Sequence, residues 1–538
     1  MTDGLTEDLF DLSADVVVVG SGAAATAAAA TAANEGAEVL LLERAEQLGG
    51  TTALSGCGAW VPNNSYMRAE GYEDPRDAAL RFMASLAYPH QYDPVSATLG
   101  LSSLAYELLE TYYDRGPEAI DYLVGCGATS FFADVGVPDY FANHPENKAP
   151  YGRLLKPPER KIAHEGAAEA HLQRMYDFIQ AKGGAVRTGH RVQSLLRNES
   201  GEVIGAEVHA GVRGILVRAR KAFVFGTGGF LHNPEMRRNF LMGPTYGGCA
   251  TPTAQGDFVT IAQEVGARFS LMQHAWWYQV PLEHAAENGH TAGGLFMPFG
   301  DSMLQVNRFG QRVINEKAPY NERGPVHFLW DGTEYPNLVL FSIFDDGVIE
   351  NPNPMRMRFP VPQRGEDVNY VVSGETIEDL AVNIEQRLEK YRAHTGGLQL
   401  SREFVANLKA TIERFNGFAR TGVDEEFGRG QEPISTLWSG PLQPDAKATM
   451  HPLRDTGPYH CVLLVAGALD TKGGPTINAR SQVLDARERP VPGLYGAGNC
   501  VASPAGQAYW GPGVTIGAAI IYGYIAGQGA AAEPVKAL

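Results

Sequence analysis

Residues 15–43 read DVVVVGSGAAATAAAATAANEGAEVLLLE, and this stretch decides the fold. Asp15–Val19 is apolar after its first residue, which is typical of a strand buried in a parallel sheet. The alanine-rich segment Ala23–Asn34 predicts a helix that ends before Gly36. Glu38–Glu43 predicts a second strand, so the stretch forms a βαβ unit and the chain an α/β fold.

The turn between the first strand and the helix has the pattern G-x-G-x-x-A. Gly20 allows a sharp turn, and Gly22 lets backbone N–H groups approach a pyrophosphate at the positive end of the helix. Glu43 ends the second strand, where its carboxylate is placed to accept hydrogen bonds from a ribose. A glycine-rich turn alone is weak evidence, but strand, turn, helix, strand and acid occur here in order. We therefore predict a Rossmann-type dinucleotide-binding domain.

Composition excludes several other classes of function. The 538 residues carry a net charge of −17, which argues against binding to nucleic acid or to anionic membrane surfaces and favours simple solubility. The five cysteines form no C-x-x-C pair, so we expect no metal site or iron–sulfur cluster. Sparse cysteines of odd number are typical of reduced thiols, which predicts a cytoplasmic protein.

Two segments bear on membranes and export. The N-terminus opens with acidic residues and has no basic region, so we do not expect a signal peptide. The most apolar stretch, Val514–Ala526, is interrupted by Gly517 and Gly523. It predicts a buried helix rather than a membrane span.

Three further segments resemble the fumarate reductase-type flavoproteins. Arg44–Gly58 (RAEQLGGTTALSGCG), Gly226–Gly229 (GTGG) and Gly493–Asn499 (GLYGAGN) match, in order, runs that contact FAD in that family. The resemblance covers essentially the whole chain and implies FAD as the cofactor. Together with the turn motif it assigns FAD contacts to Gly20, Gly22, Ala23, Ala24, Glu43, Arg44, Gly49, Gly50, Thr51, Thr52, Ser55, Gly56, Val192, Gly228, Gly498, Asn499, Val514 and Ile516.

Within that superfamily, the chain is more similar to the 3-ketosteroid Δ1-dehydrogenases. Asn315–Tyr320 (NEKAPY) carries Tyr where fumarate reductases carry the Arg that delivers a proton. Asp424–Gly430 (DEEFGRG), Gly467–Gly474 (GALDTKGG) and Tyr509–Gly517 (YWGPGVTIG) resemble further motifs of the dehydrogenases. This resemblance implies an oxidoreductase that acts on CH–CH bonds beside a ketone.

The resemblance also implies catalytic roles. The Tyr509 hydroxyl and the Gly513 N–H would hold the substrate ketone, as in an oxyanion hole. Tyr320 would take the α-proton as a phenolate, which requires a pKa below the ordinary value of about 10. The hydroxyl of Tyr140 would help to lower the pKa of Tyr320, because Asp139-Tyr140 resembles a D-Y pair of the family. Tyr140 could equally be an aromatic residue that only lines the wall of the site. The β-hydride would pass to FAD N5.

The substrate is left open between two sizes of ketone. A 3-ketosteroid is favoured, but the bulk of Trp510 and the longer loop Tyr140–Glu146 would shorten the cavity. A substituted cyclohexanone such as 4-oxocyclohexanecarboxylate is the alternative, as is an ene-reductase working in the opposite direction. Because nothing marks a haem or iron–sulfur relay, we expect a diffusible electron acceptor or a quinone.

The length predicts more than one domain. We expect residues 1–270 to form the first part of the FAD-binding domain and 451–538 its second part. Residues 271–450 would form an inserted catalytic, substrate-facing domain, with helices near Ile377–His394 and Arg402–Thr421. Strands at 186–192, 203–208 and 215–222 would form a small sheet.

Overall fold

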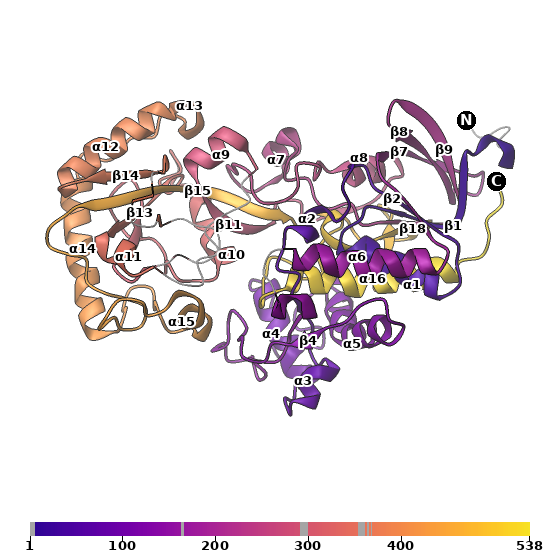
Figure 1. Cartoon of the computed structure of the whole chain (residues 1–538), viewed down its shortest axis with the longest axis horizontal. Helices are drawn as coiled ribbons and strands as arrows, with labels where there is room; N and C mark the ends of the chain where they lie inside the picture. Colours follow the sequence, from indigo (N-terminus) through magenta and orange to yellow (C-terminus); the bar gives the residue numbers. More distant parts are fainter. Residues whose placement is uncertain are drawn as a thin grey trace. The chain divides into compact units, whose positions relative to one another are not determined.

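A computed structural model describes residues 6–162, 166–290, 298, 300–352, 361–362, 365–366 and 368–538. The chain divides into two compact units (Figure 1). The first unit comprises residues 1–236, 251–275 and 470–538, and the second comprises 237–250 and 276–469. Residues 451–469, expected in the FAD-binding part, lie in the second unit. The reason is that β15 (Tyr459–Thr471) pairs with β13 (Leu340–Asp345) of that unit.

An eight-stranded sheet forms the centre of the first unit, as the α/β prediction requires. Its main order is β17-β18-β9-β1-β2-β6, and all of these neighbours are parallel except β17 and β18. The strands are β1 (Leu12–Val19), β2 (Val39–Leu42), β6 (Ala185–Arg187), β9 (Arg213–Phe225), β17 (Gln482–Leu484) and β18 (Pro490–Gly496). The expected Rossmann-type α/β fold is confirmed, with a strand from near the C-terminus paired with β9.

The small sheet expected between residues 186 and 222 is not separate. β7 (His190–Arg197) and β8 (Val203–Ala210) form an antiparallel extension of the main sheet. Strand β9 joins the two parts because it is 13 residues long. It pairs with β8 over residues 213–218 and with β18 over 223–225.

Three helices cover one face of this sheet (Figure 1). They are α1 (Ala23–Asn34), α6 (Ala167–Ala181) and α16 (Val514–Ala532). Small residues let α1 and α16 approach closely: a Cβ on Gly523 would lie 2.5 Å from the Ala24 carbonyl oxygen. Helix α16 is long and apolar enough to cross a membrane, but most of it is buried within the first unit, as a core helix is.

The remaining elements of the first unit lie in the segments that connect strands of the main sheet. A three-stranded sheet has the order β3-β5-β4, with β3 (Ala59–Trp60), β5 (Leu154–Lys156) and β4 (Phe132–Ala133). Helices α4 (Arg76–Ala87) and α5 (Ser103–Gly125) belong to the same part, and α5 packs on both α4 and α16. The other elements are α2 (Gly50–Ala53), α3 (Ser65–Ala69), α8 (Asp257–Glu264), β10 (Phe269–Ser270) and β16 (Gly474–Pro475).

The second unit is built on another sheet, with the order β11-β15-β13-β12 and with β14 paired to β15. Its strands include β11 (Ala275–Pro281), β12 (Met303–Val306) and β14 (Val371–Gly374). Met303, Leu340 and Val462 form part of a buried apolar cluster on it. The helices are α9 (Leu282–Asn288), α10 (Tyr320–Arg323), α11 (Asp346–Glu350), α12 (Ile377–Lys390), α13 (Arg392–Thr395), α14 (Phe404–Thr421) and α15 (Pro433–Ser439).

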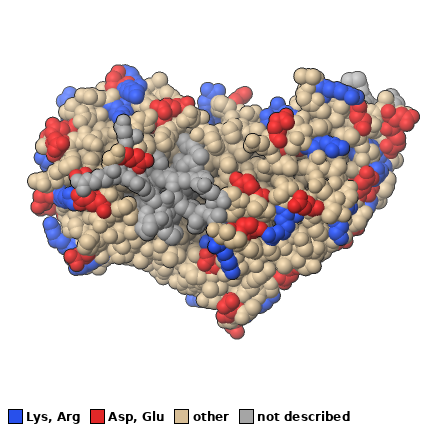
Figure 2. Space-filling view, in the orientation of Figure 1, with Lys and Arg blue, Asp and Glu red and all other residues tan. Residues whose placement is uncertain are grey.

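The surface agrees with the acidic composition. On the face shown in Figure 2, Lys and Arg side chains are interspersed with Asp and Glu side chains. A protein that tracks nucleic acid gathers its basic residues along a groove or stripe.

Candidate functional site

The predicted dinucleotide turn lies between β1 and α1. Gly20 has a φ of +106°, and its N–H donates to the Leu42 carbonyl at 2.8 Å. A side chain there would collide with the Gly226 carbonyl, so glycine is required both for backbone conformation and for close approach. Gly22 is the N-cap of α1 and provides no side chain, which leaves backbone N–H groups at the helix start.

Glu43 and Ser21 join the turn to the end of β2. The Ser21 hydroxyl donates to Glu43 Oε2 at 2.6 Å and accepts from the Gly49 N–H at 2.9 Å. Glu43 Oε1 accepts from the Ala45 N–H at 2.8 Å. Glu43 is buried. An ionised carboxylate has about four acceptor positions, so these two donors leave capacity for ribose hydroxyls.

The segment after Glu43 returns to the start of α1. Gly49 and Gly50 have φ values of +108° and +51° and open the short helix α2. The Thr52 hydroxyl oxygen accepts from the Ala23 N–H at 3.0 Å, and that of Thr51 accepts from the Thr251 N–H at 3.1 Å. Thr52 therefore occupies one N–H of the α1 N-terminus.

The other predicted cofactor residues of this region have defined places. Ser55 donates to the Thr52 carbonyl at 2.7 Å, and Gly56 follows it before β3. Arg44 pairs with Asp257 at 3.0 Å. Val192 is buried on β7. The predicted role of these four residues toward FAD stays a prediction.

The C-terminal FAD segment lies against α1. A Cβ on Gly498 would lie 3.0 Å from the Ala24 Cβ, so the loop after β18 packs on the first turn of the dinucleotide helix. The Asn499 amide donates to Asp470 Oδ2 at 3.2 Å, and the Gly229 N–H, next to Gly228, donates to the same oxygen at 2.8 Å. Burial raises the pKa of Asp470 to about 6, against the lowering effect of these donors. Asp470 thus joins two of the three predicted FAD segments.

These residues fit FAD. The start of α1 offers backbone donors for phosphates, Glu43 offers acceptors for a ribose, and glycines provide the close backbone approach that a flat, extended cofactor needs. All these features lie in one unit and meet at the ends of parallel strands, where α/β sheets bind dinucleotides.

Two of the predicted catalytic tyrosines lie together. The rings of Tyr140 and Tyr509 are 5.2 Å apart and meet at 83°, an edge-to-face contact. The Thr515 hydroxyl donates to the Tyr509 oxygen at 3.4 Å. Both tyrosines are buried, at 1% and 4% exposure. The structure therefore brings together residues far apart in the sequence.

Gly513 is the N-cap of α16 and has a φ of +94°. A Cβ there would lie 2.5 Å from the Gly58 carbonyl oxygen, so β3 and its preceding loop press on this position. Val514 and Ile516 follow in the first turn of α16 and are buried. Gly513 thus lies four residues after Tyr509, at the start of the helix.

The Trp510 side chain is buried among other aromatic residues. Its Nε1 donates to the Met83 carbonyl at 3.0 Å, and its ring packs on Trp60 at 5.3 Å and on Tyr112 at 5.5 Å. These contacts hold the indole among β3, α4 and α5. The expectation that Trp510 shortens the ketone cavity stays a prediction.

Tyr320 opens α10 in the second unit and is 6% exposed. Arg323, at the other end of this four-residue helix, is fully buried and donates to Gln279 Oε1 at 2.7 Å. Burial lowers the pKa of Arg323 to about 9, while the nearby Tyr320 and Glu316 act in the opposite direction. Glu316 is itself paired with Arg312 at 2.8 Å.

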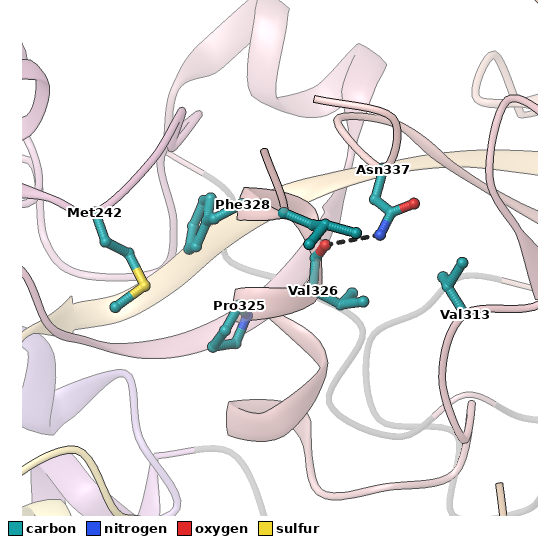
Figure 3. Close-up of a pocket in the computed structure, with 7 residues that line it drawn as sticks. Met242, Val313, Pro325, Val326, Phe328 and Asn337 are labelled. Carbon is teal, nitrogen blue, oxygen red and sulfur yellow. Dashed lines mark hydrogen bonds between the residues drawn. The ribbon is translucent and has the colours of Figure 1, made fainter. Parts of the chain in front are cut away.

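A pocket of about 540 Å³ also lies in the second unit (Figure 3). It is lined mainly by apolar side chains, among them Met242, Val313 and Phe328, and the Asn337 amide donates to the Val326 carbonyl at 3.0 Å. None of the predicted site residues lines it. Among the described residues, no group of three or more His, Cys, Asp or Glu side chains is placed to hold a metal ion.

Sequence reasoning missed several residues of the site. Ser21 was an unassigned letter of the glycine motif, although a hydroxyl there reaches Glu43. Trp60 and Arg153 lie at the ends of short strands, where no periodic pattern marks them. Asp470 stood within the quoted motif Gly467–Gly474, and an acid directly after the apolar run 461–469 was its signal.

Comparisons with known proteins place the chain among flavin-dependent dehydrogenases. The chain is 29% identical to 4-oxocyclohexanecarboxylate 2-dehydrogenase of Sinomonas cyclohexanicum, covering 96% of this chain and 92% of that protein. It is also 29% identical to 3-oxosteroid 1-dehydrogenase of Mycolicibacterium smegmatis, covering 95% and 96%. A crystal structure of 3-ketosteroid delta1-dehydrogenase from Sterolibacterium denitrificans, in complex with 1,4-androstadiene-3,17-dione, aligns with a TM-score of 0.81 and 26% identity. That alignment covers 97% of this chain and 99% of the other.

A family model described as FAD binding domain matches residues 15–516. The match runs from β1 to the first turn of α16, so it includes the dinucleotide turn, the second unit and the C-terminal FAD segment. The predicted cofactor and enzyme class are confirmed: the chain belongs to the FAD binding domain family and is an FAD-dependent oxidoreductase.

Proposed function

We propose that the chain dehydrogenates a cyclic ketone to the α,β-enone, with a 3-ketosteroid as the favoured substrate. The observation that carries this proposal is the edge-to-face pair of Tyr140 and Tyr509 beside the Gly513 turn. Tyr509 and Gly513 are four residues apart, so one short segment carries both a phenolic hydroxyl and an N–H at the start of a helix. Two such donors suit the oxygen of a ketone. The similarity to a 3-oxosteroid 1-dehydrogenase over 95% of the chain supports the substrate class.

The first task of the site is to make a C–H bond acidic. The Tyr509 hydroxyl and the Gly513 N–H donate to the ketone oxygen; the Tyr509 side chain is buried and Gly513 is half-buried. Donors fixed in this way stabilise the negative charge that develops on the oxygen as the α-proton leaves, and this stabilisation is worth more than in water. Tyr140 supports the Tyr509 ring from its edge.

The second task is proton removal. Tyr320 is the proposed base, and the neighbouring guanidinium of Arg323 favours a negative charge on its oxygen. The proton passes from the α-carbon to the Tyr320 oxygen and then to solvent. When bound, FAD supplies the hydride acceptor for the β-carbon, which completes the removal of two hydrogens. An external acceptor, a diffusible oxidant or a quinone, regenerates the oxidised enzyme.

A smaller cyclic ketone is the second candidate substrate. The observation in its favour is the similarity to a 4-oxocyclohexanecarboxylate 2-dehydrogenase over 96% of the chain. The chemistry is unchanged, because the same two donors would hold the single ketone of a cyclohexanone. The two candidates differ in how much of the ring system lies beyond the reacting carbons.

Anaerobic reduction of the bound flavin tests the proposal. The holoenzyme is mixed with androst-4-ene-3,17-dione or with 4-oxocyclohexanecarboxylate, and the flavin absorbance at about 450 nm is followed. We expect bleaching by one of the two ketones and formation of the matching enone. Bleaching by neither, together with rapid reoxidation of the reduced enzyme by fumarate, would refute the proposal.

A further inference from the structure

We propose that Trp60 is a positioning residue that fixes the ketone clamp, defined as Tyr509 and Gly513, through a buried network with Asp139 and Arg153. This inference rests on the proposed function, because it assigns to these residues the task of holding the two groups proposed to bind the ketone. All of these residues belong to the first unit. The network contacts Gly513 directly through Trp60, and it contacts Tyr509 through Tyr140.

Trp60 uses every polar group that it has. Its backbone N–H donates to the Gly513 carbonyl at 3.0 Å, and its carbonyl accepts from the Tyr112 hydroxyl at 2.8 Å. Its indole Nε1 donates to Asp139 Oδ1 at 2.6 Å. Trp60 is fully buried. One residue therefore ties the start of α16 to the loop that carries Tyr140.

The carboxylate of Asp139 is held by further donors. Arg153 Nη1 reaches Asp139 Oδ2 at 2.6 Å, and the Asn147 amide reaches the same oxygen at 3.1 Å. The guanidinium of Arg153 also forms two bonds with Asp74, at 2.6 and 2.8 Å, and lies 5.1 Å from the centre of the Trp60 ring. The orientation of the Trp60 indole is thereby fixed from both its edge and its face.

The network is transmitted to the clamp by the next residue. Tyr140 follows Asp139 directly, and its N–H donates to the Trp510 carbonyl at 3.1 Å. The Tyr140 ring then contacts the Tyr509 ring. On the other side, a Cβ on Gly511 would lie 2.6 Å from Trp60 Nε1 and 2.7 Å from Asp139 Oδ1. The clamp segment thus runs in direct contact with the Trp60–Asp139 bond.

The charges of the network indicate that it fixes the position of the clamp rather than stabilises the folded protein. Two carboxylates, Asp74 and Asp139, share the single cation Arg153, and Arg153 and Asp139 are 1% and 3% exposed. Replacing buried ion clusters with apolar side chains is often neutral or stabilising. Burial raises the pKa of Asp139 to about 6, against the lowering effect of Arg153. A directional network of this kind specifies geometry.

The test compares Trp60→Phe with a matched control. Trp60→Phe removes the Nε1 donor and keeps an aromatic ring, whereas Tyr522→Phe removes a buried hydroxyl that donates to the Leu108 carbonyl at 2.6 Å and not to a member of the network. Both variants are compared in flavin content, melting temperature and the rate of flavin reduction by ketone. A displacement of about 1 Å at a reacting group costs about a hundredfold in rate. We expect Trp60→Phe to slow flavin reduction about a hundredfold at saturating ketone, with the ketone Kd changed by less than about threefold. Tyr522→Phe should leave both unchanged.

Hydrogen exchange of the segment 507–517 gives a readout that does not depend on turnover. The Gly517 N–H donates to the Gly513 carbonyl, which also accepts from Trp60. We expect faster exchange of this segment in Trp60→Phe, and also in Asp139→Asn should Trp60→Phe fail to fold, but not in Tyr522→Phe. Unchanged exchange, or a rate loss that matches the control, would overturn the inference. If no ketone reduces the wild-type flavin, the proposed function fails and exchange alone decides the inference.

Discussion

The rings of Tyr140 and Tyr509 form an edge-to-face contact, with an interplanar angle of 83° and ring centres 5.2 Å apart. Removing either hydroxyl leaves this ring contact in place, so the two tyrosines can be tested separately. We expect Tyr509→Phe to slow flavin reduction by ketone about a hundredfold or more, because one donor to the developing oxyanion is lost. Tyr140→Phe should have a smaller effect. Stopped-flow absorbance measures both, and equal losses would contradict the assigned roles.

The base is tested by the pH dependence of the reaction. Tyr320→Phe should abolish most flavin reduction while FAD remains bound. It should also remove the rise of the rate with pH that wild-type enzyme shows as its base ionises. The profile of the reduction rate between pH 6 and about 10 is the measurement. A variant that keeps the wild-type profile would exclude Tyr320 as the base.

The buried carboxylate of Asp139 predicts a specific pH dependence of stability. Its pKa rises from the ordinary 3.8 to about 6 on folding, so between these values the folded protein holds a proton that the unfolded chain does not. Protonation therefore stabilises the folded state as the pH falls through 6, and this contribution is lost as the pH rises again. Melting temperatures at pH 5 and 7.5 should show wild type gaining relative to Asp139→Asn at the lower pH. Equal changes of melting temperature in the two proteins would contradict this prediction. The pH-dependent contribution of Asp470 cancels in the comparison, because both proteins contain it.

A pair of helical glycines tests the packing of α16 on β3. A Cβ on Gly517 would collide with the Trp60 carbonyl and lie 2.6 Å from the Tyr112 hydroxyl, so Gly517→Ala should lower the melting temperature and the flavin content. Gly417 lies within α14 with open space around its Cβ position. Gly417→Ala should stabilise by about 0.5–1 kcal/mol. Denaturant titrations check both, and similar effects at the two positions would refute the packing argument.

Glu43 is expected to set the affinity for the adenosine half of FAD. Glu43→Gln replaces an ionised acceptor by an amide beside two existing donors, so FAD should bind about tenfold more weakly. The exposed Glu46→Gln serves as control. Titration of apoprotein with FAD, followed by flavin fluorescence, gives both Kd values. Equal affinities would remove Glu43 from the cofactor site.

The extent of sequence prediction follows the range of the interactions. The β1–α1–β2 segment was predictable because turn, helix and strand signals lie within thirty residues, and helix Ala23–Asn34 has its predicted bounds. The contact of Tyr140 with Tyr509 was not predicted, because nothing local links residues so far apart and the family resemblance had associated Tyr140 with Tyr320. Trp60 and Arg153 gave no signal, since two- and three-residue strands have no readable period. The pairing of β15 with β13 could not be read from the sequence, because an apolar run does not reveal which sheet it will join.

The pairing of β18 with β9 has a consequence for synthesis of the chain. When residues 12–225 leave the ribosome, β9 can pair with β1, but its other edge still lacks β18 over Phe223–Phe225, and α1 lacks the α16 surface that buries it. An unpaired strand edge and an uncovered apolar helix are aggregation hazards. Both stay uncovered until about 300 further residues have been translated, at roughly 5–20 residues per second. The nascent chain therefore exposes this strand edge and this helix face for longer than its individual elements need to fold.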